Sequence, residues 1–168
     1  GDEESRVRYR SVLQSFFVAR SASLSQLSQD RLSRGSVLRI LDSKAAADQE
    51  HVREAPPILD FLTETAAERL NSVLDGLRSA GVPFVVNSRL VRGLDYYCHT
   101  AFEFVERTSP TSGDGAGEAT ELATGSAVLA GGRYDGLSEA LGGPPIACIG
   151  WAAGVDRLAG LANEKGGL

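Results

Sequence analysis

Three segments combine residue types that could bind an anionic or aromatic ligand. The first, residues 90–97 (LVRGLDYY), places an arginine within a predicted strand. If this strand is buried, Arg92 must find an anion, because an unpaired buried guanidinium is very costly. Neighbouring strand residues point to opposite faces, so only one of Tyr96 and Tyr97 can line a given pocket. The alternative is a structural ion pair between Arg92 and Asp95 with tyrosines in the core, which the spacing alone slightly favours, and both interpretations stay open.

The other two segments pair small residues with an arginine. In residues 130–136 (AGGRYDG), two glycines leaving a strand let backbone N–H groups approach a ligand, and Arg133 adds a positive fork. The segment matches neither a P-loop nor GxGxxG. In residues 149–158 (IGWAAGVDRL), small residues leave room for a flat ligand, and Arg157 could stack on a purine while reaching a phosphate. A tight turn with a solvated arginine, and close strand–helix packing, are the structural alternatives.

The elements that must position these residues predict an α+β fold. Residues 1–54 are nearly free of glycine and read as helical, and an apolar stripe from Leu59 to Leu77 predicts a helix that ends near Gly81. Consecutive strands without helices between them favour an antiparallel sheet flanked by helices. We expect strands at 84–86, 90–97, 100–105, 126–130 and 146–151, short helices at 135–141 and 152–162, and a mobile loop at 107–125.

Composition and charge narrow the class of protein. The 168 residues carry a formal net charge of −5, which argues against a non-specific nucleic-acid coat or a basic membrane-surface protein. No apolar run approaches the roughly 20 residues that span a bilayer, and no signal-peptide pattern opens the chain. Cys98 and Cys148 form no CxxC, and with His51 and His99 they have no zinc-site spacing. We therefore expect a reduced, soluble, cytoplasmic protein without a metal site or a membrane partner.

Taken together and in this order, the segments resemble histidyl-tRNA synthetase, a class II aminoacyl-tRNA synthetase. RGLDYY and GGRYDGL resemble the two histidine-specific motifs of the family, and GWAAGVDRL resembles class II motif 3. GDEESRVRYRSVL, VLRILDSK and LVRGLDYYCHTAFEF also read like bacterial members. The resemblance covers nearly the whole chain.

The resemblance implies roles for residues around the amino acid. Arg92 contacts the ATP α-phosphate and the histidine carboxylate, and is the catalytic positive charge. Tyr97 hydrogen-bonds the substrate imidazole with Tyr96 beside it, and Tyr134 closes the histidine pocket.

It also implies roles for residues around the nucleotide. Arg157 stacks on the adenine and approaches the γ-phosphate, and Arg133 is a further candidate for ATP binding. Glu103 is a candidate acid on the side of a Mg²⁺ ion that accompanies ATP. Histidine, ATP and tRNA(His) are the implied substrates, and the implied parent protein is a homodimer.

The chain also departs from the family pattern. It contains neither motif 1 nor motif 2 nor the anticodon-binding domain, Asp156 stands where glutamate is usual, and residues 107–125 are longer than expected. We expect residues 1–57 to be a helical insertion that leans on the tRNA acceptor stem, and residues 58–168 to be the C-terminal half of the catalytic core. The chain is then a fragment that is inactive in isolation.

A rival interpretation is a non-catalytic relative. Such proteins serve as the regulatory subunit of ATP phosphoribosyltransferase, or as the uncharged-tRNA sensor of a translation-factor kinase. Arg92, the adjacent tyrosines and the insertion-like residues 1–54 favour the ligase, because a regulatory subunit needs neither the activating charge nor the insertion. A purely structural α+β domain is the third interpretation, and it requires the three motifs to be coincidental.

Overall fold

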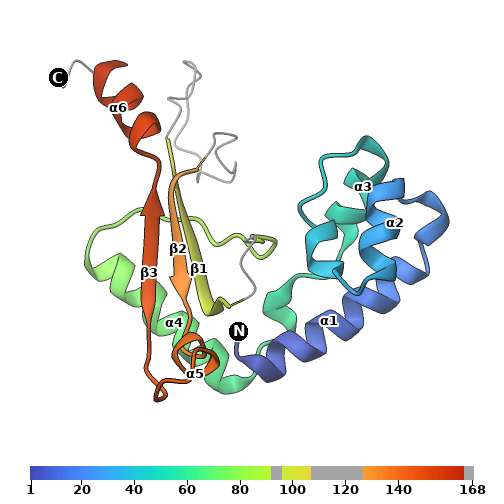
Figure 1. Ribbon diagram of the computed structural model, residues 1–168, viewed down its shortest axis with the longest axis horizontal. Coiled ribbons are helices and arrows are strands. Elements are labelled where there is room, and N and C mark those ends of the chain that lie inside the picture. Colours follow the sequence, from blue (N-terminus) through green and yellow to red (C-terminus); the bar gives the residue numbers. More distant parts are fainter. Residues whose placement is uncertain (92–95, 107–126, 165–168) are drawn as a thin grey trace. The chain divides into compact units, whose positions relative to one another are not determined.

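The computed structural model describes residues 1–91, 96–106 and 127–164, which form two compact units (Figure 1). Unit 1 is Gly1–Val82 with a segment that begins at Ser88, and unit 2 is Pro83–Asn87 with a segment that begins at Tyr96. Unit 1 is helical, whereas unit 2 holds the sheet. The assignment of residues 1–57 to an insertion and of 58–168 to half of a catalytic core stays a prediction.

The first helix, α1 (Glu3–Val18), supplies the central stripe of the unit 1 core. It begins at Asp2, whose carboxylate accepts a hydrogen bond from the Ser5 backbone N–H at 2.9 Å. Residues four apart lie on one face of a helix, so a repeat of four gives a continuous stripe. The buried residues of α1 follow this repeat: Ser5, Tyr9, Leu13 and Phe17.

Two short helices and three 3₁₀ turns fold around α1. They are a 3₁₀ turn at Ser21–Ser23, α2 (Gln26–Ser33), a turn at Val37–Ile40, α3 (Ala46–Glu54) and a turn at Ile58–Phe61. Just after α2, Gly35 has a φ of 70°, the left-handed conformation that glycine adopts readily, and this is where the sequence indicated a break. The remaining buried apolar residues of the core cluster are Leu24, Leu32, Val37, Ile40, Leu41 and Ala55.

A buried carboxylate joins α2 to α3. Asp48 accepts hydrogen bonds from the Ser25 N–H (2.7 Å) and from the hydroxyls of Ser25 (2.7 Å), Ser28 (2.6 Å) and Ser43 (2.5 Å). Burial raises the pKa of Asp48, but these hydrogen bonds outweigh burial and lower it from 3.8 to about 2. The charged carboxylate is therefore the form that holds the two helices together.

The helix α4 (Glu64–Ser79) corresponds to the predicted apolar stripe. The Thr63 hydroxyl caps it by accepting a hydrogen bond from the Ala66 N–H at 3.2 Å, so the helix begins later than the stripe, which starts in the preceding 3₁₀ turn. Gly81 follows with a φ of 67°, which confirms the expected end of the helix.

Unit 2 is built on an antiparallel sheet of three strands. These are β1 (Cys98–Val105), β2 (Ala127–Arg133) and β3 (Ile149–Ala153), in the order β1-β2-β3. Two helices accompany them, α5 (Leu137–Ala140) and α6 (Val155–Glu164). Helices together with an antiparallel sheet confirm the predicted α+β class (Figure 1). No helix among the described residues is long and apolar enough to cross a membrane.

Several expected elements differ from those observed. Residues 84–86 are not a strand, because they pair with no other strand among the described residues. α3 falls within residues 1–54, which were expected to be helical, but its buried residue is Asp48 and not an apolar side chain. Of the expected strand 90–97, residues 90, 91, 96 and 97 are irregular, whereas 92–95 and the predicted mobile loop 107–125 lie outside the described residues.

Replacing the buried carboxylate of Asp48 should destabilise unit 1. Asp48→Ala leaves three buried or half-buried serine hydroxyls without their acceptor, so we expect a loss of about 3 kcal/mol in the free energy of unfolding. Urea unfolding followed by circular dichroism measures this loss. Asp30→Asn, a change at an exposed carboxylate of α2, is the control and should shift the free energy by no more than about 0.5 kcal/mol.

The same residue predicts an acid sensitivity. Because the folded-state pKa of Asp48 lies below the ordinary 3.8, its contribution is complete above about pH 4 and disappears as the pH falls toward 2. A difference of nearly two pKa units corresponds to about 2 kcal/mol. Asp48→Asn should remove this part of the acid-induced loss of stability. If the free energy of unfolding of Asp48→Asn fell with acid as steeply as that of the unsubstituted protein, Asp48 would not be the group responsible.

Candidate functional site

The pairing of the strands separates the sheet into two chemically different faces. Gly132 lies opposite Ala101 and Gly150, and Ala130 lies opposite Glu103 and Ala152. Paired residues, and residues two apart in a strand, share one face. We call this the small-residue face, made of Ala101, Glu103, Ala130, Gly132, Gly150 and Ala152.

The opposite face is aromatic. Gly131 lies opposite Phe102 and Trp151, and a Cβ added at Gly131 would meet the Phe102 ring and the Trp151 Cβ, each at 2.7 Å. The rings of Phe102 and Phe104 pack edge to face, with centroids 6.1 Å apart. Gly131 therefore lets apolar side chains close over β2 on this face.

Three tyrosines gather at one end of the small-residue face. Their ring centroids are 4.9 Å apart for Tyr96–Tyr97, 5.5 Å for Tyr96–Tyr134 and 6.3 Å for Tyr97–Tyr134. A Cβ added at Gly132 would lie 2.5 Å from Cδ1 of Tyr97, and one added at Gly150 would collide with the Tyr134 hydroxyl. The two glycines thus create the space that the rings occupy, and we call these residues the tyrosine cluster.

Local geometry fixes the position of the tyrosine cluster. The Tyr134 N–H donates to the Cys148 carbonyl at 2.8 Å, which extends the β2–β3 pairing to the residue that carries the ring. Tyr97 and Tyr134 are half-buried, whereas Tyr96 is exposed. Aromatic faces next to phenolic hydroxyls suit a flat ring that also carries hydrogen-bonding nitrogens.

Arg157 lies at the other end of β2. Its guanidinium donates a hydrogen bond to the Ala127 carbonyl at 2.6 Å, from the first turn of α6. Arg133 lies six positions after Ala127 along the strand, a distance of about 20 Å at the usual rise per residue. The structure therefore brings Tyr96, Tyr97 and Tyr134 together and does not place Arg157 beside them.

Arg133 is engaged in an ion pair. Its Nε donates to both carboxylate oxygens of Asp135, at 2.9 and 2.7 Å, and the Cys148 N–H donates to the same carboxylate at 3.1 Å. Desolvation raises the pKa of Asp135, but the hydrogen bonds from Arg133 and Cys148 and the positive charge of Arg133 hold it below its ordinary value. Asp135 therefore connects the end of β2 with the segment that enters β3.

Glu103 and Arg92 are the two remaining predicted site residues. Glu103 is half-buried on the small-residue face, opposite Ala130 and thus between the two ends of β2. Arg92, with its alternative partner Asp95, lies outside the described residues. The roles predicted for all these side chains stay predictions.

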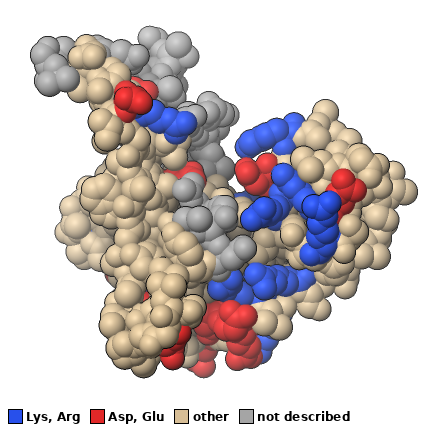
Figure 2. Space-filling model, viewed as in Figure 1, with Lys and Arg blue, Asp and Glu red and all other residues tan. Residues whose placement is uncertain are grey.

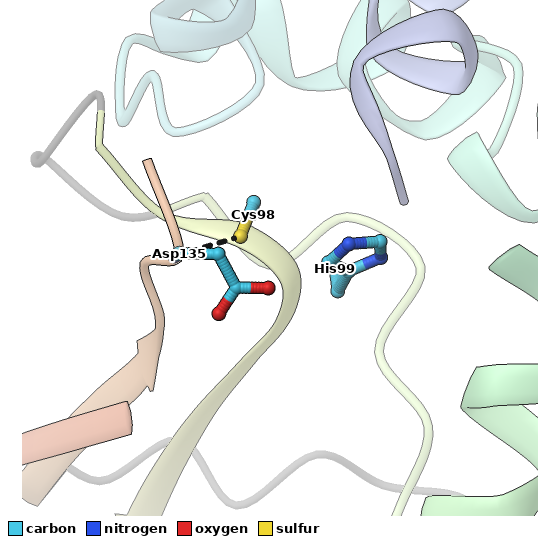
Figure 3. Close-up of side chains that lie close together, drawn as sticks. All are labelled: Cys98, His99 and Asp135. Carbon is cyan, nitrogen blue, oxygen red and sulfur yellow. Dashed lines mark hydrogen bonds between the residues drawn. The ribbon is translucent and has the colours of Figure 1, made fainter. Parts of the chain in front are cut away.

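The structure also groups three side chains that the sequence did not connect. Cys98, His99 and Asp135 place one potential ligand atom each within 4.8 Å of one another (Figure 3). Asp135 comes 36 residues after His99, so no short spacing motif revealed the group. The adjacent Cys-His pair was the one available signal.

Comparisons with known proteins agree with the resemblance in the sequence. The chain is 48% identical over 166 residues to a histidine–tRNA ligase from Novosphingobium aromaticivorans, covering 99% of this chain and 36% of that protein. The ligase from Pediococcus pentosaceus is 47% identical over 165 residues, covering 98% of this chain and 36% of that protein. No protein-family model matches the chain.

A solved structure gives the same result for the fold. The apo histidyl-tRNA synthetase of Staphylococcus aureus superposes with a TM-score of 0.64 at 31% identity, covering 99% of this chain and 37% of that one. The chain thus spans a little over a third of the length of the relatives it matches. By sequence over nearly its whole length and by fold, the chain is similar to one part of histidyl-tRNA synthetases.

Proposed function

We propose that this chain is the part of a histidine–tRNA ligase that holds the side chain of histidine and one end of ATP. The observation that carries the proposal is the tyrosine cluster on its glycine floor, formed by segments that match the histidine-specific motifs. The relatives named histidine–tRNA ligase, which are 47–48% identical over 165–166 residues of this chain, support it.

In this proposal the substrate imidazole lies against the tyrosine cluster. A ring of that size fits where Gly132 and Gly150 bring Tyr97 and Tyr134 close to the sheet. The Tyr97 hydroxyl accepts from or donates to an imidazole nitrogen, and Tyr134 closes the pocket. A buried hydroxyl left unpaired by the wrong amino acid costs binding energy, which gives selectivity for histidine.

ATP extends from the tyrosine cluster toward α6. Arg157 stacks on the adenine from the far end of β2, and the distance of about 20 Å along the strand accommodates an amino acid joined to a nucleotide. Glu103 faces the strip between them, and a single carboxylate together with substrate phosphates is the usual setting for Mg²⁺. When bound, this ion neutralises phosphate charge, and Arg133 stays in its ion pair with Asp135.

The reaction is adenylate formation followed by transfer. A histidine carboxylate oxygen attacks the α-phosphorus of ATP, the bond to the bridging oxygen breaks, and pyrophosphate leaves. Arg92 stabilises the negative charge that builds up on the α-phosphate. A hydroxyl of the terminal adenosine of tRNA(His) then attacks the histidyl carbonyl, and AMP leaves. No side-chain nucleophile takes part, so catalysis consists of orientation and positive charge.

Other features of the proposal concern the whole protein. Basic side chains gather over unit 1 on the face shown in Figure 2, and residues 1–54 carry nine Lys or Arg against eight Asp or Glu. This charge suits contact with a tRNA acceptor stem.

The full-length protein is a cytoplasmic homodimer. The rest of its ATP site comes from residues outside this chain, so the isolated chain binds histidine and ATP weakly.

Arg92→His in the full-length protein tests the catalytic role. Removing one preorganised charge from the transition state should lower the rate of histidine-dependent ATP–pyrophosphate exchange by about 10²–10³-fold. Arg78→His is the control, because Arg78 is exposed on α4 and pairs with Asp75, and it should leave the rate unchanged. Near-normal exchange by Arg92→His would refute the role. If the wild-type protein bound histidine but catalysed no ATP–pyrophosphate exchange, it would be a non-catalytic relative of the ligases.

Gly132→Ala in the full-length protein tests the glycine floor. The added methyl group displaces the Tyr97 ring, so we expect KM for histidine to rise at least about tenfold while KM for ATP changes little. Gly136→Ala is the matched control, since no atom lies within 4 Å of its added Cβ. Equal effects of the two substitutions, or an effect on ATP alone, would show that the tyrosine cluster does not hold histidine.

A further inference from the structure

Cys98, His99 and Asp135 converge where β1 begins, next to the turn that follows β2 (Figure 3). All three are half-buried, and their potential ligand atoms lie within 4.8 Å of one another. Cys98 is the strand partner of Arg133, which shares its face with Gly131. The group therefore lies on the side of the sheet opposite the small-residue face and is separate from the proposed histidine site.

An irregularity in β1 brings two consecutive residues to one place. In a regular strand Cys98 and His99 would point to opposite faces. Here the β1–β2 pairing shifts between Cys98 and Ala101, and His99 has a φ of 55°, the one positive φ of a non-glycine residue among the described positions. Such a bulge redirects a side chain, and a left-handed residue other than glycine has a conformational cost that the surroundings must offset.

The neighbours of these side chains resemble those of metal ligands. The Asp135 N–H donates to the Cys98 Sγ at 3.4 Å, so the sulfur already has a fixed polar neighbour. The Asp135 carboxylate is oriented by Arg133 and by the Cys148 N–H, as ligating carboxylates commonly are. Its Oδ2 accepts a hydrogen bond from Arg133 at 2.7 Å, and a carboxylate oxygen has a further lone pair that a cation can take.

We propose that Cys98, His99 and Asp135 form a binding site for a single zinc-class divalent cation. A thiolate, an imidazole and a carboxylate are the donors that zinc prefers, whereas Mg²⁺ and Ca²⁺ take oxygen ligands alone. Ligand atoms around tetrahedral zinc lie about 3.5 Å apart. Side-chain movements of about 1 Å would therefore bring the three ligand atoms within bonding distance of one ion. Three protein ligands leave the fourth position to water.

The expected role of the ion follows from its place in the chain. Cys98 directly follows Tyr97, and Asp135 directly follows Tyr134. A cation bound to both residues ties the two backbone segments that carry these tyrosines, and it positions the tyrosine cluster from the opposite face of the sheet.

Cobalt titration of a single-cysteine chain tests the site directly. In Cys148→Ser the only thiol is Cys98, so a thiolate-to-cobalt charge-transfer absorption that saturates at one Co²⁺ per chain can come from Cys98 alone. Zn²⁺ should displace the cobalt, abolish the band and raise the melting temperature. His99→Gln should weaken Co²⁺ binding by more than about 10–100-fold, the loss that follows when only an outer-shell partner of a ligand is removed.

The matched control is Cys98→Ser, which keeps Cys148, the other half-buried free cysteine. It should lose the absorption band and the thermal effect of Zn²⁺ while retaining the same circular dichroism spectrum. The absence of a charge-transfer band in Cys148→Ser would overturn the proposal. So would a Co²⁺ affinity of Cys98→Ser equal to that of Cys148→Ser. These readouts use no substrate, so they succeed or fail independently of the proposed ligase activity.

Discussion

Two adjacent glycines in the central strand determine what can lie on either face of the sheet. At Gly131 a Cβ would strike the Phe102 ring, and at Gly132 it would strike the Tyr97 ring on the other side. One pair of missing side chains therefore permits an aromatic layer on one face and a ligand-sized floor on the other. Gly150, in the neighbouring strand, likewise leaves space for the Tyr134 ring because it has no Cβ. Because nearby backbone or packed side chains confine these rings, the strand pairing has to be correct before the tyrosine cluster can form.

Asp135 stabilises that arrangement from the end of the strand. Its carboxylate accepts hydrogen bonds from Arg133 and Cys148, and its N–H donates to the Cys98 Sγ. A single residue thus contacts β1, β2 and the entry to β3. This explains why the arginine of GGRYDG is held in the scaffold, where the sequence left open a role in ligand binding. A cation at the adjacent Cys-His pair would strengthen the same connection.

The sequence predicted those parts of the fold that depend on local patterns. The apolar stripe of α4, its end near Gly81 and the antiparallel pairing of residues in β1 and β2 were all foreseeable from periodicity and glycine placement. The tyrosines were foreseeable as a group only through the family resemblance, because Tyr134 lies 37 residues after Tyr97. Long-range polar contacts were not foreseeable. Asp48 finds its serines through packing, and the bulge at His99 reverses the direction that strand alternation assigns.

We propose that the tyrosine cluster over Gly132 and Gly150 is the histidine end of a ligase site. The most direct measurement is a crystal structure of the full-length protein with histidine bound. We expect the imidazole to lie against Tyr97 and Tyr134 on the small-residue face, within hydrogen-bonding distance of a tyrosine hydroxyl. A histidine bound on the aromatic face beside Phe102 and Trp151, or bound with no contact to either tyrosine, would contradict it.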